Sequence, residues 1–474
     1  MGGLYHTLNI GSQALFATRQ GVDTAGHNIS NAHTEGYSRQ RVNLKQRVPT
    51  EMHGIVRGNG VFVNNITRAH DKFIEKSLNK SQQDFGDSQT YHRELKSLED
   101  IFSPELNTTT DKEISLFFNS IRDLANMPED LTVRTAVKES AVNLSDSFRR
   151  VDRDLERRQQ DVNQRIAGEV DEAARLLRGI AHLNAQIQYT EAGDRQEAGD
   201  LRDQQEKMVR DLSQKIEVNY YRGDMGMLVV RGPNESLLVD RNFHANIAPR
   251  VREGDNSFFE IVVMDTDGNR ASAISRHNST GSLKALFRVR DEEIPELRQR
   301  NNVLAYTLGN AVNSIHRRGY GLNDFKESTG RDFFSLSEDL DTAASSIVIS
   351  SDIWESTDAI SAAMTPSAPG DNVMANELLR LENQKLLLNG NATFNEYYSD
   401  YVGQYGLEVV RAKHIQEADE VVLNDIKSQK ESVSGVSMDE EAASLLKWQA
   451  NFTASSRVIT TVDEMLETVL SLKR

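Results

Sequence analysis

The first thirty residues carry apolar and small side chains in one narrow stripe. The stripe positions are spaced alternately by four and three residues, which is typical of a helix that presents a thin face to another helix. Gly, Thr and Ala occupy three of the positions, so the stripe is weak. Its members are Leu4, Leu8, Gly11, Leu15, Thr18, Val22, Ala25 and Ile29.

A second stripe with the same alternation closes the chain. It follows Ser437, and Glu440 stands three residues later, which together form the signature of a capping box at a helix start. Its members are Leu445, Trp448, Phe452, Ser455, Ile459, Val462, Leu466 and Val469. Most stripes of this kind are simply the core faces of helices, so periodicity alone favours two ordinary helices packed on a globular core. Pairing of the two end helices with each other is the alternative.

The pattern between the two ends predicts helices, then strands, then helices again. Alternating apolar residues and glycine turn points favour strands in the middle of the chain, and 3.6-residue periodicity favours long helices around them. Helices are predicted at 70–102, 111–126, 131–190, 197–215, 281–318, 371–388 and 392–433. Extended chain is predicted at 48–67, 216–280 and 319–365, with a hairpin turn at Asp265-Thr266-Asp267-Gly268-Asn269.

This order predicts a mainly α protein with a β-rich middle domain (α+β). A chain whose end helices pair and whose strands lie in the middle should be elongated, with both termini at one end. At 474 residues it should contain about two to four domains.

Charge and composition narrow the functional classes. The chain has 55 basic and 71 acidic residues, giving a net charge of −16, so nucleic acid is not expected as a partner. No stretch has the ~18 apolar residues that a membrane helix needs, so membrane insertion is not expected. Cysteine is absent, which excludes disulfides, thiolate metal sites and Cys nucleophiles. The N-terminus lacks the features of a cleavable signal peptide.

Few residues in the sequence suggest a catalytic, nucleotide-binding or metal-binding site. There is no Walker A loop, no G-x-S-x-G and no H-E-x-x-H. His27, His33, His53 and His70 are spaced by 6, 20 and 17 residues, which matches no zinc pattern, so no metal, cofactor or catalytic residue is predicted.

The segment NISNAHTEGYSRQR at 28–41 directly follows the first stripe. Ser30, His33 and Glu35 resemble a catalytic set by type, but neighbours in one turn usually point apart, whereas a triad is assembled from distant segments. Asn28, Asn31 and Gly36 suit Asx turns and positive φ, and Tyr37 supplies an apolar anchor. The segment is therefore interpreted as a joint rather than an active site.

These residues also carry a resemblance to a known family. Asn28-Ile29-Ser30-Asn31, Thr34 and Gly36-Tyr37-Ser38-Arg39 resemble the N-terminal signature of the bacterial flagellar rod, hook and hook-associated proteins. Residues 434–459 resemble the matching C-terminal signature. Gly58-Asn59-Gly60-Val61, Ile66-Thr67-Arg68 and Gly281–Leu286 with Arg290-Asp291 narrow the resemblance to the FlgK type of hook-associated protein.

The resemblance implies a secreted, extracellular structural protein of the flagellum and no enzyme. Such a protein would be exported through the flagellar type III apparatus and form a ring of identical subunits at the junction of hook and filament. Hook protein would lie below it, a second junction protein and the filament above, and an export chaperone would bind its C-terminal region. A hook or distal-rod protein is the nearest alternative, and a hydrolase domain within 216–365 is a remoter one.

The resemblance also assigns roles along the chain. Terminal coiled-coil helices at 1–47 and 434–474 would form an inner tube, a helical shaft would comprise 48–215, 281–318 and 366–433, and a strand-rich outer domain would comprise 216–280 and 319–365. The expected assembly seam is Leu4, Leu8, Leu15, Val22, Ile29, Leu445, Trp448, Phe452, Ile459, Val462 and Leu466. The expected joint is Asn28, Asn31, Thr34, Gly36, Tyr37 and Arg39, with Arg39 and Tyr37 locking the terminal helix to the shaft. The end helices are expected to become ordered only on assembly.

Overall fold

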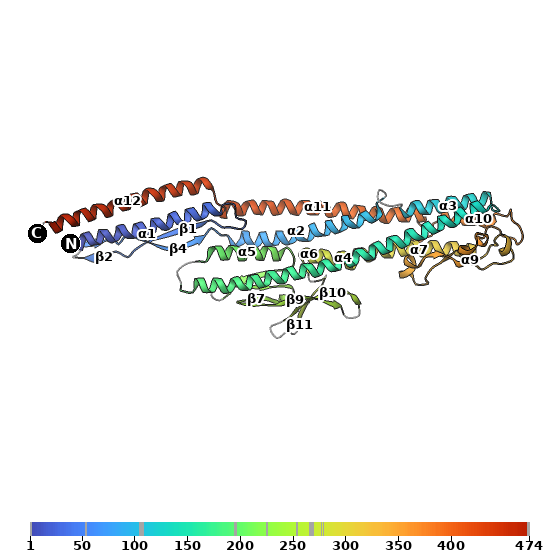
Figure 1. Cartoon of the computed structure of the whole chain (residues 1–474), viewed down its shortest axis with the longest axis horizontal. Helices are drawn as coiled ribbons and strands as arrows, with labels where there is room; N and C mark the ends of the chain where they lie inside the picture. The colour runs from blue at the N-terminus through green and yellow to red at the C-terminus, as the bar shows by residue number, and fades with distance from the viewer. Residues whose placement is uncertain are drawn as a thin grey trace.

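The protein is a long rod whose two termini lie together at one end (Figure 1). The computed structural model describes residues 2–52, 55–103, 109–193, 197–223, 226–252, 255–264, 270–275, 277 and 279–471. Helices dominate and several small antiparallel sheets accompany them. The predicted fold class, mainly α with a β-rich part in an elongated molecule, is confirmed.

The end of the rod that holds both termini is built from a helix pair and a β-hairpin. Helix α1 (Gly2–Asn31) packs along α12 (Met438–Ser471), so the pairing of the two end helices is confirmed. Strand β1 (Gln40–Gln46) pairs antiparallel with β4 (Val61–Arg68), and both contact α1. The hairpin tip carries β2 (Thr50–Met52) and β3 (Ile55–Arg57). The predicted extended segment at 48–67 is therefore confirmed.

A bundle of long helices forms the shaft. Its members are α2 (Lys72–Glu99), α3 (Thr110–Asn126), α4 (Leu131–Glu191), α5 (Gly199–Ser213), α6 (Gly281–Arg288), α7 (Ile294–His316) and α11 (Phe394–Ser434). The 61 residues of α4 span about 90 Å at the usual helical rise. Local signals start these helices: the Asp71 and Asp130 carboxylates cap α2 and α4, and Thr393 forms a capping box with Glu396 at α11. The core is formed by the apolar faces of these helices together with residues of the sheets and of the segment 333–392.

The strand-rich part at 216–280 packs against the second half of α4. One sheet has the order β5-β6-β7-β8 and comprises β5 (Asn219–Arg222), β6 (Leu228–Arg231), β7 (Leu237–Asp240) and β8 (Phe243–His244). The other has the order β11-β10-β9 and comprises β9 (Asn246–Arg252), β10 (Asp255–Met264) and β11 (Arg270–Ile274). The buried Asn184 amide of α4 donates to the Leu228 carbonyl at 2.8 Å and anchors the first sheet. The hairpin turn predicted at 265–269 lies outside the described residues.

The prediction of a second strand-rich segment at 319–365 is wrong. Its described strands are only β12 (Phe334–Ser335) and β13 (Val348–Ile349), and the rest is turns and short helices that include α8 (Ala343–Ser346) and α9 (Ser351–Glu355). Phe334 and Ser335 pair with Ile349 and Val348 in a short antiparallel ladder, as the pattern predicts, but the other apolar residues of the segment lie in turns and short helices that pack against α4 and α7.

This segment also lies far from the sheets at 216–280. Arg134, near the start of α4, donates to the Ile360 carbonyl at 2.8 Å, whereas Asn163 and Asn184, much further along the same helix, bind the sheets. Figure 1 shows α9 and α10 (Val373–Arg380) at the end of the rod away from the termini. The two segments therefore do not form one outer domain.

Two other predicted helices are interrupted. The helix predicted at 281–318 contains a π-helical turn at Val289–Glu293 between α6 and α7. Arg290 within that turn is fully buried and donates to the Asn163 Oδ1 and the Phe259 carbonyl, each at 2.8 Å, so it joins the helices to β10. The helix predicted at 371–388 ends as α10 at Arg380, followed by a short 3₁₀ turn.

Candidate assembly site and its joint

The two terminal helices run antiparallel and approach each other closely at glycines. A Cβ atom on Gly11 would lie 2.9 Å from the Ile459 Cγ1, and one on Gly21 would lie 2.4 Å from the Trp448 ring. Only glycine allows the backbones to come this near without displacing those side chains. The contact between α1 and α12 therefore depends on the small residues of α1 as much as on its leucines.

The predicted seam residues are divided between this contact and the surface. On α1, Leu4, Leu8, Leu15, Val22 and Ile29 are half-buried; on α12, Val462 is buried and Leu445, Trp448, Ile459 and Leu466 are half-buried. Phe452 remains 43% exposed. Gly21 and Asn28, each one position before a predicted seam residue, contact α12. The two helices thus cover each other's stripes in part within one chain. The role of these residues in assembly stays a prediction.

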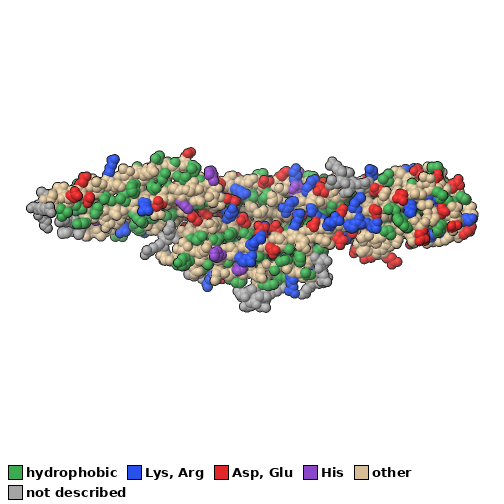
Figure 2. Space-filling view, viewed as in Figure 1, with side chains coloured by type: hydrophobic (Ala, Val, Ile, Leu, Met, Phe, Trp, Pro, Cys, Tyr) green, Lys and Arg blue, Asp and Glu red, His purple; other side chains and the backbone are tan. Residues whose placement is uncertain are grey.

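The helix pair nevertheless keeps large apolar side chains on its outer surface. These are Tyr5, Phe16, Leu446, Phe452, Val458, Met465, Val469 and Leu470. Figure 2 shows hydrophobic side chains over this end of the rod. Large apolar side chains exposed together on one part of a protein are a common mark of a protein–protein contact.

Asn28 is the centre of the joint. Its side chain is buried near the end of α1, where its Nδ2 donates to the Gln40 carbonyl at 2.9 Å and to the Glu441 Oε2 at 3.1 Å. Its Oδ1 accepts from the Tyr37 hydroxyl at 2.7 Å and from the Gln40 amide at 2.9 Å. All its hydrogen-bonding capacity is thus used to hold the helix, the turn, β1 and α12 together.

The turn itself occupies fewer residues than expected. Asn28, Ser30 and Asn31 are helical, so the prediction that Asn28 and Asn31 form Asx turns is wrong; a helical asparagine here satisfies its side chain through tertiary contacts. Gly36 has φ +85°, which agrees with its predicted role in the turn. The Thr34 hydroxyl donates to the Asn31 Oδ1 at 3.2 Å.

Arg39 joins the joint both to the last helix and to the end of the shaft helix α11, where its backbone amide donates to the Ser434 carbonyl at 2.9 Å. Its guanidinium contacts the Glu440 and Glu441 carboxylates, each at 2.6 Å, at the start of α12. A further link to the shaft comes from Ser38, whose backbone amide and hydroxyl donate to the two Asp203 oxygens of α5 at 2.8 Å. Glu35 also pairs with Lys207, which lowers the pKa of that carboxyl.

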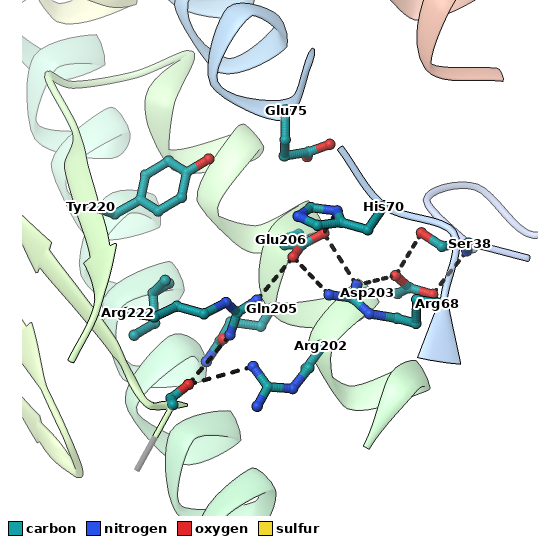
Figure 3. A network of polar contacts seen from close by, with 12 residues as sticks. Ser38, Arg68, His70, Glu75, Arg202, Asp203, Gln205, Glu206, Tyr220 and Arg222 are labelled. Atoms are coloured by element: carbon teal, nitrogen blue, oxygen red, sulfur yellow. Dashed lines mark hydrogen bonds and ion pairs between the residues drawn. The ribbon is translucent and has the colours of Figure 1, made fainter. Parts of the chain in front are cut away.

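A buried ion network continues from Asp203 into the shaft (Figure 3). Arg68 at the end of β4 contacts the Asp203 Oδ1 at 2.5 Å and the Glu206 Oε1 at 3.0 Å, and Arg222 of β5 contacts the same Glu206 oxygen at 3.0 Å. Burial opposes the charged forms, but the two carboxylates outweigh it and raise the pKa of Arg68. Burial likewise acts against Glu206, yet the Arg68 charge and hydrogen bond leave the pKa of Glu206 lowered. For Asp203 burial dominates and raises its pKa.

Sequence reasoning named Arg68 but missed its acidic partners. Asp200, Asp203 and Glu206 recur every three residues along α5, a spacing that places acids on one face of a helix. That periodicity was the available signal. It did not show which cation the acids would meet, because Arg68 is 135 positions from Asp203.

The candidate catalytic set is not assembled. The Ser30 hydroxyl donates to the Gly26 carbonyl in its own helix, Glu35 pairs with Lys207, and His33 is exposed. His27 contacts Asp200 at 3.1 Å, while His53 lies outside the described residues. A cavity of about 360 Å³ beside the first sheet has one acidic lining residue, Asp240, and no histidine. The converging groups that a hydrolase would need are therefore not found in that cavity.

One trio has the spacing for a metal ion. His70, Glu75 and Glu206 place their ligand atoms within 4.8 Å of one another. Both carboxylates, however, are already paired: Glu75 with Arg210 and Lys430, and Glu206 with Arg68 and Arg222. A divalent cation at this position would lie beside four positively charged side chains. Their repulsion makes the trio unsuited to binding a metal ion.

Comparisons with known proteins agree with this architecture. A family model described as "Flagellar hook-associated protein FlgK helical domain" matches residues 95–334, and one described as "Flagellar basal body rod FlgEFG protein C-terminal" matches residues 428–472. The flagellar hook-associated protein 1 of Salmonella typhimurium is 23% identical over 98% of this chain and 99% of its own. That of Bacillus subtilis is 24% identical over 99% of each.

A solved structure has the same fold. The flagellar hook junction protein FlgK from Burkholderia pseudomallei superposes with a TM-score of 0.67 at 15% identity, covering 75% of this chain and all of that one. The rod with paired end helices is thus that of a flagellar axial protein, a class of structural proteins rather than enzymes. Within that class, the chain belongs to the FlgK family of flagellar hook-associated proteins.

No helix among the described residues is long and apolar enough to span a bilayer.

Proposed function

We propose that the protein is the structural subunit that joins the flagellar hook to the filament. It would be exported through the flagellar type III apparatus, be secreted to the cell exterior, and assemble there as a ring of identical copies. Hook protein would lie below the ring, and a second junction protein and the filament above it. An export chaperone would bind the C-terminal region before export. Its relatives' names support this placement.

The observation that carries the proposal is the surface of the terminal helix pair. The pair covers its own inner stripe but leaves Leu446, Phe452, Met465 and Leu470 of α12 exposed. Fully burying one such side chain stabilises a contact by about 1.5–3 kcal/mol. Burial of these side chains between neighbouring copies would therefore favour association at this surface. In this arrangement the terminal helices form the inner tube, the shaft surrounds them, and the sheets at 216–280 face outward.

The joint suits this role because it fixes the angle between the helix pair and the shaft. Asn28, Arg39, Ser38 and Arg68 connect α1, α12, β4 and α5 through buried or half-buried polar contacts. The hook or distal-rod alternative shares the end helices, but the FlgK helical-domain match across 95–334 favours the junction.

Deletion of residues 1–35 or 437–474 tests the proposal. The shaft and sheets should stay folded, because their core is separate from the terminal pair, whereas ring formation should be lost. Circular dichroism measures the first and electron microscopy of assembled material the second. Rings formed equally well by the truncated chain would contradict the inner-tube assignment. In cells, loss of the gene should leave hooks without filaments.

The expectation that the ends become ordered only on assembly is tested separately. Hydrogen exchange of the free full-length protein should be fast over residues 2–31 and 438–471 compared with α4. Slow exchange at these ends in the monomer would show that the intrachain pair is already stable, and that assembly adds contacts to a preformed surface.

A further inference from the structure

A cavity of about 1110 Å³ opens between the first half of α2 and the strands β5 and β6. It lies next to the network in Figure 3, to which β5 contributes Tyr220 and Arg222, α2 contributes Glu75, α5 contributes Glu206 and the segment after β4 contributes His70. None of the terminal-helix residues that carry the proposed assembly lines it.

Two polar groups on the cavity wall have hydrogen-bonding capacity to spare. Asn79 is only 6% exposed, and its Nδ2 donates to the Tyr220 hydroxyl at 2.8 Å, but its Oδ1 has no partner. Because that hydroxyl accepts from Asn79, its own proton is left for another acceptor. Burial, reinforced by the nearby Glu75 and Glu206, raises the pKa of Tyr220 to about 12, so it stays a donor at neutral pH. An unpaired buried polar atom costs about 1–3 kcal/mol, which a ligand could recover.

One wall of the cavity is the edge of a sheet. Strand β5 (Asn219–Arg222) pairs with β6 on one side, and no other described strand pairs with its second side. All four residues of β5 line the cavity. The unpaired amide and carbonyl groups of such an edge are the usual acceptor site for an added strand of peptide.

The rim of the cavity is basic. Lys72, Lys76 and Lys80 follow one another at four-residue intervals on α2, so they lie on one face of the helix. Lys80 pairs with Asp84, but Lys72 and Lys76 are exposed and have no acidic partner among the described residues. Phe73 between them is 84% exposed.

The acidic lining residues offset only part of this charge: Glu235 pairs with Arg231, and Glu217 is the one acidic lining residue without a cationic partner among the described residues, against the two unpaired lysines. Glu75 and Glu206 are each paired with two cationic side chains. Neither carboxylate is therefore available to neutralise the lysines at the cavity rim. The whole chain has a net charge of −16, whereas the face of α2 that borders the cavity presents the positive charges of Lys72 and Lys76. This face favours an acidic partner over a cationic one.

We propose that this cavity binds an extended acidic segment of a partner polypeptide. The segment adds as a strand to the free edge of β5. Its carboxylates face Lys72 and Lys76, an apolar side chain covers Phe73, and polar groups reach the Asn79 Oδ1 and the Tyr220 hydroxyl. This site goes beyond the ring contact and does not require it.

The test uses the full-length protein and an acetylated eight-residue peptide of alternating Glu and Val. Calorimetry should show saturable binding that weakens as salt is raised. A peptide of alternating Lys and Val should bind at least tenfold more weakly. A peptide of alternating Glu and Pro, which has half as many backbone N–H groups to donate, should also bind at least tenfold more weakly.

Variants of the protein test whether the peptide binds in this cavity. Lys72→Glu together with Lys76→Glu should weaken Glu–Val binding about tenfold or more, whereas Lys326→Glu with Lys413→Glu, which changes net charge equally on exposed residues outside the cavity, should leave it unchanged. Asn79→Leu should weaken binding with the rim intact.

Three outcomes would overturn the proposal. Equal affinity for the Glu–Val and Lys–Val peptides would remove the charge argument, and equal affinity for the Glu–Pro peptide would remove strand addition. Saturable binding of zinc chloride that is lost in His70→Ala, without peptide binding, would assign the cavity to a metal ion instead.

Discussion

Asn28 and Glu441 are 413 positions apart in the sequence, and the Asn28 Nδ2 lies 3.1 Å from the Glu441 Oε2 in a buried contact. The same asparagine holds Tyr37 and Gln40, so one side chain connects the first helix, the turn, the first strand and the last helix. Its replacement should therefore loosen the whole joint.

Asn28→Ala removes four hydrogen bonds and leaves the buried Glu441 without one partner. We expect the free energy of unfolding of the terminal unit to fall by about 2–4 kcal/mol. Hydrogen exchange in α1 and α12 of the assembled protein, where the terminal pair is expected to be ordered, measures this. Asn31→Ala is the matched control, because the Asn31 amide bonds mainly within its own helix, and it should cost less than about 1 kcal/mol. Equal effects of the two changes would argue against Asn28 as the centre of the joint.

Gly21→Ala should separate the terminal helices. The new methyl group would lie 2.4 Å from the Trp448 ring, so the ring or the helix must move, at a cost of about 1–3 kcal/mol. Gly26→Ala is the control in the same helix, because nothing lies within 4 Å of its Cβ position. That change should stabilise the helix by about 0.5–1 kcal/mol. Thermal unfolding and Trp448 fluorescence of both variants decide the matter; a stabilising Gly21→Ala would show that the close approach is not maintained in solution.

Arg68→Met should be strongly destabilising, because it leaves Asp203 and Glu206 buried without their main cation. Breaking a buried pair in this way costs about 3–5 kcal/mol. Arg68→Lys keeps the charge but loses the two-pronged contact and should recover only part of that loss. Urea unfolding provides the measurement. Arg19→Met, at an exposed pair with Asp23, is the control and should change stability by less than about 1 kcal/mol.

His316 should make stability depend on pH. His316 is the last residue of α7, and its side chain is fully buried. Its Nδ1 lies 2.9 Å from the Arg331 carbonyl, and its Nε2 accepts a hydrogen bond from the Ser361 amide at 2.9 Å. Burial lowers its pKa to about 4, against 6.5 for an exposed histidine. The unfolded chain thus binds a proton that the folded chain rejects. Stability from His316 is fully present above pH 6.5 and declines as pH falls toward 4, by about 3 kcal/mol in all.

The measurement is the urea unfolding free energy from pH 7.5 to pH 4.5, for the natural chain and for His316→Gln. Carboxylates titrate in both proteins, so the difference between the two curves reports His316 alone. That difference should shrink as the pH falls. A difference that stays constant over this range would show that His316 does not change protonation on unfolding.

Helices and their ends were largely predictable from the sequence because their signals are local. The periodicity of α4 and the acids that cap α2 and α4 lie within a few residues of the structure they cause. The same locality made the end stripes visible. It failed over most of 319–365, where only β12 and β13 are strands and the other apolar residues lie in turns and short helices packed on α4 and α7; burial alone does not distinguish the two. It failed also at Asn28, whose residue type suggests a turn but whose helical position is set by contacts with Gln40 and Glu441.

By itself, the sequence determined the helical rod, the stripes at its two ends and the family resemblance carried by the joint, since each depends on residues close together along the chain. Only the tertiary structure decided that Gly11 and Gly21 set the distance between α1 and α12, and that Arg68 meets Asp203 and Glu206. The tertiary structure alone decided that β5 has one edge without a partner strand and that this edge lies beside the lysines of α2. Those relationships depend on which faces of distant elements meet, and close packing and charge pairing across the folded chain determine that choice.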